Sequence, residues 1–188
     1  MRIITLGVDC GVTFRLRDLK IKQENSLFEW WASPIFKEVV DVLEKCLNGE
    51  KLVVVNTHMV GNHNYEGTTI RTAHYIGKTG ERSIDAIVDR RSERLREYLC
   101  GSEKVIFMRE LGGDNILETV KRFKEVIERF NPSLQYKLII MDNSLEPCEP
   151  LEHVFFYKID RSKYMEYIYN CFGEHPPIVP RIITDMDP

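Results

Sequence analysis

Short, continuous apolar runs alternate along this chain with longer stretches whose apolar residues recur at helical spacing. The runs predict strands at residues 2–6, 52–55, 104–108, 136–141 and 153–157. A second extended segment or strand is expected over 68–76, after a polar stretch. The helical stretches lie between the runs, so the order of elements is strand, helix, strand for most of the chain.

Helical periodicity predicts five helices, at residues 11–19, 35–48, 83–99, 115–130 and 164–172. Ser83 is the expected N-cap of the third helix, and Gly101 ends it. Ser33 followed by Pro34 predicts an N-cap with proline at the first helical position for the second helix.

Strands that alternate with helices favour an α/β fold with a mostly parallel sheet. The runs at 52–55, 105–108 and 138–141 are apolar throughout, as expected of strands buried on both faces, so we expect them beside the strand at 2–6. The predicted architecture is a single domain over residues 1–188. It is a three-layer α/β/α sandwich of the Rossmann-like kind, with an irregular, proline-rich tail from about residue 176.

Composition narrows the classes of function. The 188 residues are 43% hydrophobic and 29% charged, which is ordinary for a soluble globular domain, and the net charge of −3 predicts no nucleic-acid partner. No signal peptide and no membrane segment is expected. The five cysteines are scattered and form no CxxC pair, so a reducing cytoplasm is the expected location, without structural disulfides.

Cys10 is the main candidate for chemistry. It lies between the first predicted strand and the first helix, at or near the helix N-terminus, where backbone N–H groups and the helix dipole stabilise a thiolate. Such a cysteine can act as a nucleophile. The alternative is a small buried residue at a tight strand–helix turn.

Further candidates follow the ends of the predicted parallel strands, where sites form in open α/β sheets. They are Asp9, Asn56, His58, Arg109, Glu110, Asp142 and Asn143. By position alone His58 and His74 are equal candidates for a general base. His58, His63 and His74 are irregularly spaced for a metal site formed by these three histidines, so no metal site is expected. The segment after the first strand is not GxGxxG and has no Walker-type lysine, so no cofactor is expected.

Several segments, taken in order, are similar to a bacterial family classed as papain-like cysteine peptidases and otherwise of unknown function. The similarity covers about residues 2–110. The matching segments are Leu6-Gly7-Val8-Asp9-Cys10, Leu16-Arg17, Ser26-Leu27-Phe28-Glu29-Trp30, Ser33, His74-Tyr75, Arg90-Arg91 and Arg109. Glu29 stands where the family has aspartate, and Tyr75 replaces the aspartate that follows the family's histidine.

The resemblance implies a cysteine-dependent hydrolase or acyl-transfer enzyme. Cys10 would attack an acyl carbon, His74 would take and return the proton, and Glu29 would orient the imidazole. The expected substrate-binding residues are Trp30, Arg91 and Arg109, because an arginine fork matches a carboxylate or phosphate. The substrate would be a small molecule or a peptide.

Two other functions remain open at this stage. A transferase or esterase could use the same crevice, with Arg91 and Arg109 holding an anionic or sugar-linked substrate and Cys10 only lining it. A non-catalytic ligand-binding domain could use Phe28-Glu29-Trp30-Trp31 as a recognition loop, although two tryptophans beside a helix are also typical of a core. The alternating strand–helix order differs from the papain fold, in which a helix packs on an antiparallel sheet.

Overall fold

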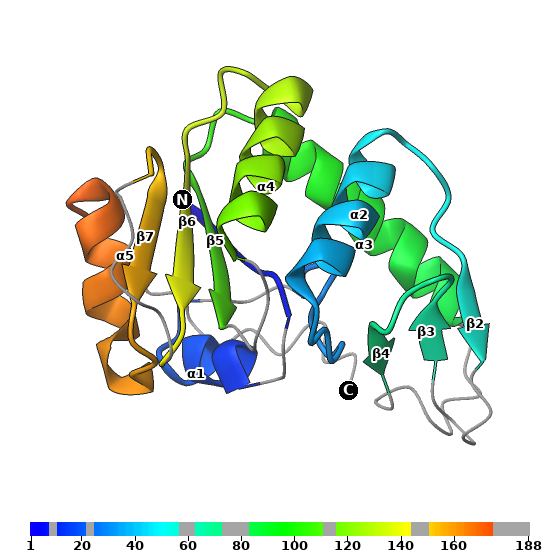
Figure 1. The fold of residues 1–188 in the computed structure, drawn as a ribbon, viewed down its shortest axis with the longest axis horizontal. Coiled ribbons are helices and arrows are strands. Elements are labelled where there is room, and N and C mark those ends of the chain that lie inside the picture. Colours follow the sequence, from blue (N-terminus) through cyan, green and yellow to red (C-terminus); the bar gives the residue numbers. More distant parts are fainter. Residues whose placement is uncertain are drawn as a thin grey trace.

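The main sheet has four parallel strands (Figure 1). The computed structural model describes residues 1–7, 11–21, 25–56, 63–72, 83–110, 116–143 and 151–174. The strands lie in the order β1 (Arg2–Thr5), β5 (Val105–Glu110), β6 (Tyr136–Met141) and β7 (Val154–Tyr157). In their register, Ile3 of β1 pairs with Ile106 of β5, and Met108 of β5 pairs with Ile139 of β6. The parallel sheet and the mixed α/β class are therefore confirmed.

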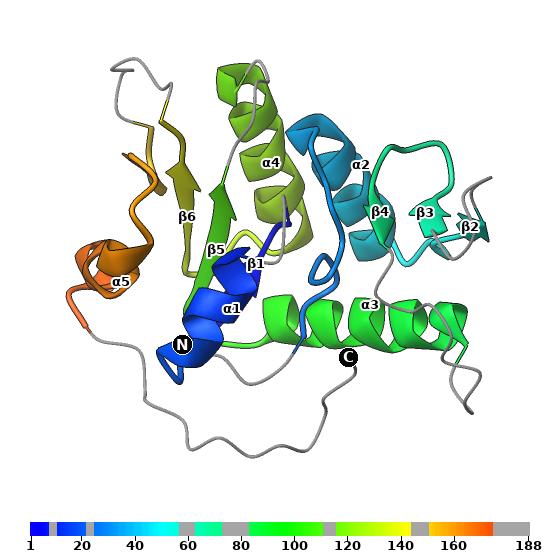
Figure 2. The ribbon, with the colours of Figure 1, turned by 90° about the horizontal axis from the view of Figure 1, so that it is seen from below.

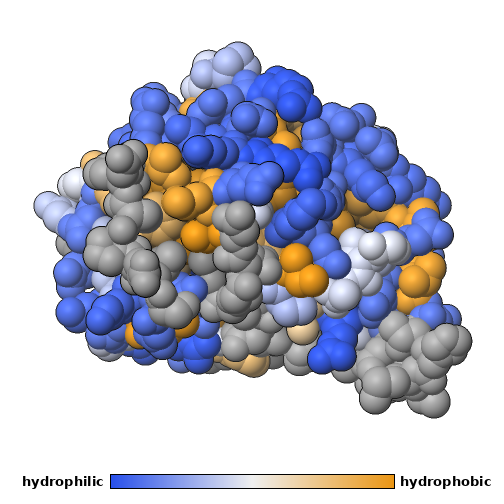
Figure 3. Space-filling model, viewed as in Figure 1, coloured by the Kyte–Doolittle hydropathy of each residue, from blue (hydrophilic) through white to orange (hydrophobic). Residues whose placement is uncertain are grey.

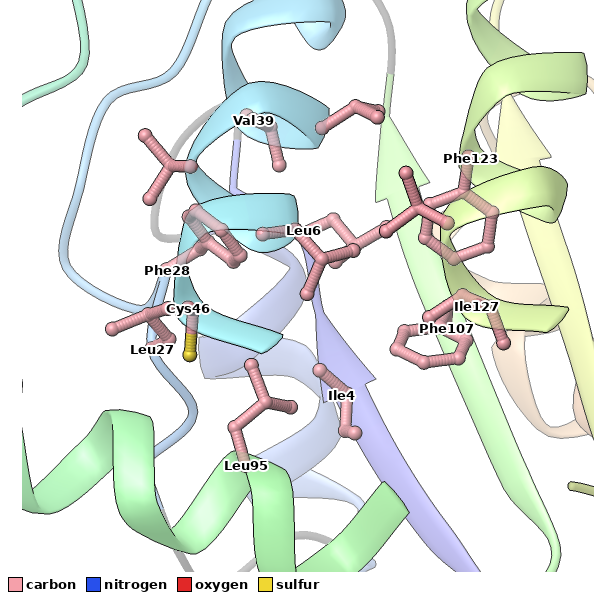
Figure 4. Close-up of a cluster of buried hydrophobic side chains, with 14 of the residues drawn as sticks. Ile4, Leu6, Leu27, Phe28, Val39, Cys46, Leu95, Phe107, Phe123 and Ile127 are labelled. Atoms are coloured by element: carbon pink, nitrogen blue, oxygen red, sulfur yellow. The ribbon is translucent and has the colours of Figure 1, made fainter. Parts of the chain in front are cut away.

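One face of this sheet carries the larger hydrophobic core. The helices that pack there are α2 (Phe36–Leu47), α3 (Ile84–Cys100) and α4 (Ile116–Phe130). Figure 4 shows their side chains meeting Ile4 and Phe107 from the strands and Leu6 just after β1. Phe107 meets Phe123 of α4 edge to face, with ring centroids 5.0 Å apart. Such ring pairs contribute beyond the area that they bury.

The opposite face carries a smaller core. It is covered by α1 (Gly11–Asp18) and α5 (Tyr164–Phe172), which follows a short 3-10 turn at Arg161–Lys163. Strand residues alternate between the two cores because successive side chains point to opposite faces. Figure 2 views the sheet from the carboxyl ends of its strands and shows α1 against the sheet near β1 and β5.

A second, three-stranded sheet corrects one prediction. The run at 52–55 was expected to be a buried parallel strand, but β2 (Val54–Asn56) pairs antiparallel with β3 (His63–Tyr65), and β3 pairs with β4 (Arg71–Thr72). Val53 and Val55 are exposed, while Leu52 is buried. Hydrophobic surface at the right edge of Figure 3 lies over β2. Burial thus alternates along the four apolar residues, of which only Val54 and Val55 lie in the small sheet.

The helices and the strands of the main sheet follow the predicted ranges closely, and two have the same bounds, β6 and α5. In the small sheet, β3 lies in the stretch expected to be polar and without a strand, and β4 is shorter than the segment expected over 68–76. Ser83 caps α3, since its side chain accepts a hydrogen bond from the N–H of Ala86. The cap predicted at Ser33 is wrong: α2 begins after Ile35, and the Ser33 hydroxyl instead donates to the carbonyl of Leu6 at 3.4 Å. The proline-rich tail from residue 176 lies outside the described residues.

Candidate functional site

A buried carboxyl group, that of Glu29, lies beside the end of β1. Its side chain is 1% exposed. Its Oε1 accepts hydrogen bonds from the Ser26 backbone N–H at 2.9 Å and from the Ser26 hydroxyl at 3.0 Å. The Thr5 hydroxyl donates to the same oxygen at 3.2 Å and lies 3.5 Å from the hydroxyl of Thr13 in α1. Hydrogen bonds of this kind fix the orientation of a buried polar group.

The residue after Glu29 has an unusual backbone. Trp30 has a φ of +69°, a left-handed conformation that is costly for a bulky residue. The Thr72 hydroxyl donates to the Trp30 carbonyl at 2.5 Å, and the indole N–H of Trp30 donates to Asn25 Oδ1 at 3.0 Å. Strained residues persist only where the surroundings hold them, and they cluster at functional sites.

Arg91 reaches the same turn from α3. Its side chain is buried, and Nη1 donates to the backbone carbonyl of Glu29 at 3.2 Å. The sequence placed Arg91 on an apolar helix stripe, where a charged group requires a polar partner. The structure brings Arg91 to Glu29 through the backbone, and a role in substrate binding stays a prediction.

Arg109, near the end of β5, is fully buried and holds the backbone on two sides. Nη1 donates to the carbonyl of Leu6 and Nη2 to the carbonyl of Ser33, both at 2.7 Å. The guanidinium also lies over the Phe36 ring, 4.7 Å from its centroid. These contacts join the end of β1 to the segment before α2, and the substrate-binding role expected for Arg109 stays a prediction.

Glu110, the next residue, points to the opposite face of the sheet and forms a cluster outside the predicted site. Arg161 binds its carboxylate with two bonds, Nε to Oε1 at 2.9 Å and Nη2 to Oε2 at 2.7 Å, and the Tyr164 hydroxyl donates to Oε1. Burial raises the pKa of Glu110, but the bonds from Arg161 and Tyr164 outweigh burial, so its pKa lies below the ordinary value.

Arg161 was missed by the sequence reasoning although a signal was present. Polar residues were collected after the first strands of the sheet, and the same rule applied to β7 leads to the segment that contains Arg161. Asn56 was collected by this rule, but it ends β2 in the small sheet, so it does not lie at the predicted sheet edge.

Cys10 and His74, the predicted nucleophile and base, lie outside the described residues, as does His58. Their neighbours in the chain are described. Gly11, directly after Cys10, is the first residue of α1, and Thr72, two residues before His74, ends β4. The backbone of Arg71 pairs with that of Ala32 through two hydrogen bonds, of 2.7 and 2.9 Å, so β4 runs along the segment that follows Glu29.

The described cysteines differ in exposure. Cys46 and Cys171 are buried, and Cys100 is exposed. Burial raises the pKa of the Cys46 thiol and raises that of Cys171 to about 12, so neither is a thiolate at neutral pH. Among the residues that the structure describes, no three His, Cys, Asp or Glu side chains are grouped to hold a metal ion.

Trp30 and its neighbours bear on the expectation of a recognition loop. Phe28 and Trp31 are fully buried, and Trp30 is 7% exposed. Trp31 stacks on Tyr65 with ring centroids 4.2 Å apart, and Phe14 of α1 meets Trp30 edge to face at 5.2 Å. In the structure these aromatic rings belong to the packing around the Glu29 turn, and the substrate-binding role of Trp30 stays a prediction.

Comparison with known proteins adds no family assignment. Protein-family models, curated proteins and solved structures give no match to the chain. Within the described part of the chain, none of the helices has the length and apolar character needed to span a membrane. The similarity to papain-like cysteine peptidases therefore stays a prediction from the sequence.

Proposed function

We propose that this chain is a cysteine-dependent hydrolase or acyl-transfer enzyme, with Cys10 as nucleophile, His74 as general base and Glu29 as the group that orients the imidazole. The substrate is a small molecule or a peptide with an acyl group, and the expected setting is the cytoplasm. The proposal includes the finer fold expectation of a Rossmann-like three-layer sandwich, which the two hydrophobic cores on opposite faces of the sheet support.

One chain of contacts carries the proposal. Thr13, three residues after Cys10, lies 3.5 Å from Thr5, which donates to the carboxyl group of Glu29. Thr72, two residues before His74, donates to the carbonyl of Trp30, next to Glu29. The described neighbours of both predicted catalytic residues therefore converge on one turn, Glu29-Trp30, which carries the buried carboxyl group. Such convergence from distant parts of the sequence is what a catalytic triad requires.

The chemistry follows from these roles. His74 takes the proton of the Cys10 thiol, and the thiolate attacks the acyl carbon to form a thioester. The proton then moves from the imidazolium to the departing group as the bond to it breaks. In the second half, His74 takes a proton from water and the resulting hydroxide attacks the thioester. The C–S bond breaks, the carboxylic acid leaves, and the imidazolium returns its proton to the Cys10 sulfur. An acceptor hydroxyl or amine in place of water gives acyl transfer.

The decisive experiment measures the reactivity of Cys10 in the full-length protein. Alkylation by iodoacetamide is followed from pH 5 to 10 by peptide mass spectrometry, which separates Cys10 from the other four thiols. Exposed Cys100 is the reference thiol in the same molecule. We expect Cys10 to have a pKa below the ordinary thiol value of about 8.5 and to react faster than Cys100 at pH 6–7. His74→Ala should slow this reaction several-fold.

Activity provides the second measurement. We expect release of p-nitrophenol from p-nitrophenyl acetate, lost in Cys10→Ser and retained in Cys100→Ser, which is the matched control. Glu29→Gln should lower the rate while the protein stays folded by circular dichroism. A Cys10 that reacts only after denaturation would refute the nucleophile. Activity that survives in Cys10→Ser would favour the transferase or esterase alternative, in which Cys10 only lines the crevice.

A further inference from the structure

The Glu110 cluster lies on the face of the sheet that α1 covers, and the function proposed above does not use it. Its members come from three elements: Glu110 from β5, Arg161 from the 3-10 turn and Tyr164 from the start of α5. Glu110 is 4% exposed and Tyr164 is fully buried, whereas the Arg161 side chain is 45% exposed. A buried acceptor thus holds a cation that reaches the surface.

The orientation of the Arg161 guanidinium is fixed by these contacts. Two parallel hydrogen bonds to one carboxylate define the plane of the guanidinium as well as its position. The Tyr164 hydroxyl holds the carboxylate in turn. The backbone is fixed too, because Arg15 of α1 donates from Nε to the Arg161 carbonyl at 2.9 Å.

The guanidinium lies directly against the first residue of α1. A Cβ placed on Gly11 would be 2.3 Å from Nη2, 2.5 Å from Cζ and 2.7 Å from Nη1 of Arg161. The three distances are similar, so the flat face of the guanidinium covers Gly11. Only glycine leaves the space for this contact, and the preceding residue is Cys10.

The net charge around Gly11, counted from α1, Arg161 and Glu110, is positive. The N-terminus of a helix carries about half a positive charge, and Arg161 adds a full one on Gly11. Glu110 supplies one negative charge, because its carboxylate binds the Nε and Nη2 edge of the Arg161 guanidinium. A cation at a helix N-terminus is unfavourable by itself, and an additional anion beside Gly11 reduces this cost.

We propose that Arg161, held by Glu110 and Tyr164, is an electrostatic positioning residue that favours the thiolate of Cys10. The inference rests on the proposed function, since it concerns the nucleophile assigned there. Arg161 acts through Cys10 and takes no part in bond formation. The other charged residues to consider are Arg15 of α1, which bonds the Arg161 backbone, Glu29, which accepts from Thr5, and Asp9, which precedes Cys10 in the sequence. All three are kept in every variant below.

The test is the pH profile of Cys10 alkylation in full-length variants. Arg161→Gln removes the positive charge, and we expect it to raise the pKa of the Cys10 thiol by about one unit. The alkylation rate at pH 6 would then be about tenfold lower, while the plateau rate at high pH, where the thiol is fully ionised, would be unchanged. Glu110→Gln removes the negative charge from the same ion pair and should lower this pKa. Arg129→Gln, on the opposite face of the sheet, is the matched control and should leave the profile unchanged.

The opposite signs separate an electrostatic role from a structural one. Loosening of the fold would move the pKa in the same direction in Arg161→Gln and Glu110→Gln, and that result, or no shift in Arg161→Gln, would overturn the inference. Gly11→Ala keeps every charge and favours the helix, but it pushes the guanidinium away, so an intermediate rise is expected. This variant tests the proposal even where the ion-pair variants do not fold.

The wild-type profile separates this inference from the proposed function. An ordinary thiol pKa for Cys10 in the wild-type protein would contradict the function proposed above, and with it the basis of the inference. A lowered wild-type pKa that is unchanged in Arg161→Gln and in Gly11→Ala would contradict the role of Arg161 alone.

Discussion

Gly7 and Gly49 have almost the same positive φ in different surroundings, so they form a matched pair for one substitution. Their φ angles are +78° and +77°. A Cβ on Gly49 would meet nothing within 4 Å, whereas a Cβ on Gly7 would lie 2.0 Å from the Ser33 hydroxyl oxygen and 3.4 Å from the carbonyl oxygen of Trp31. Alanine at both positions therefore separates the cost of the backbone conformation from the cost of the contact.

The expected losses of unfolding free energy differ clearly. Gly49→Ala should cost about 1 kcal/mol, since a left-handed residue with a Cβ is disfavoured by roughly 1–2 kcal/mol and alanine gains a little through the unfolded state. Gly7→Ala has the same cost and also displaces the Ser33 hydroxyl from Leu6 and Arg109. Two weakened hydrogen bonds at about 0.5–1 kcal/mol each and overpacking of about 1 kcal/mol raise its cost to about 3–4 kcal/mol.

Urea unfolding followed by circular dichroism measures both variants, and thermal melting gives a second reading. For a chain of this size the difference of about 2–3 kcal/mol corresponds to a melting temperature lower by about 4–12 °C in Gly7→Ala than in Gly49→Ala. Ser33→Gly should recover part of the loss when it is combined with Gly7→Ala, because it removes the opposing side chain. Equal losses in the two alanine variants, within about 0.5 kcal/mol, would refute the role of Ser33.

Two further predictions concern the adjacent residues that end β5. Arg109→Met should lower the unfolding free energy by about 3–5 kcal/mol in urea titrations, because the buried carbonyls of Leu6 and Ser33 lose their short hydrogen bonds from Arg109. Arg109→Lys should lose less, and a loss under about 1 kcal/mol in Arg109→Met would contradict the role of Arg109 in holding these two carbonyls. Glu110 has a folded-state pKa below its ordinary value of 4.5, so its contribution is present above about pH 4.5 and is lost as the pH falls through the lower folded-state pKa. Below pH 4.5 the melting temperature of Glu110→Gln should therefore fall less than that of the wild-type protein, and parallel acid profiles would contradict this linkage.

The sequence predicted the main sheet well because its strands are long apolar runs separated by strongly periodic helices. Residues 136–141 and 164–172 have the same bounds in the structure. The run at 52–55 failed for a physical reason. Valine favours strands in any sheet, and four apolar residues in a row do not show whether both faces are buried or only one. In β2 only one side is covered.

The candidate site was predictable only in part. The rule that polar residues follow the ends of parallel strands identified Arg109 and Glu110, but it could not show that one binds backbone carbonyls and the other a cation. The alternation of side chains along a strand predicts that the two point to opposite faces. Their partners, Ser33 and Arg161, are 76 and 51 residues away in the chain, and neither pairing has a local signal.

Through these two partners, the adjacent residues Arg109 and Glu110 of β5 each fix one end of the connection from β1 to α1. Arg109 holds Leu6 before the connection, from one face of the sheet, and Glu110 holds Arg161 against Gly11 after it, from the other. Fixing both ends of a short connection restricts its backbone before the substrate binds. Less conformational entropy is then lost when the catalytic geometry forms. The two arrangements differ in what they fix, because Arg109 holds the backbone carbonyls of Leu6 and Ser33, whereas the guanidinium of Arg161 lies against Gly11, the residue after Cys10. Loss of the Arg109 contacts should therefore lower Cys10 reactivity at every pH, and loss of the Arg161 charge should shift its pH profile.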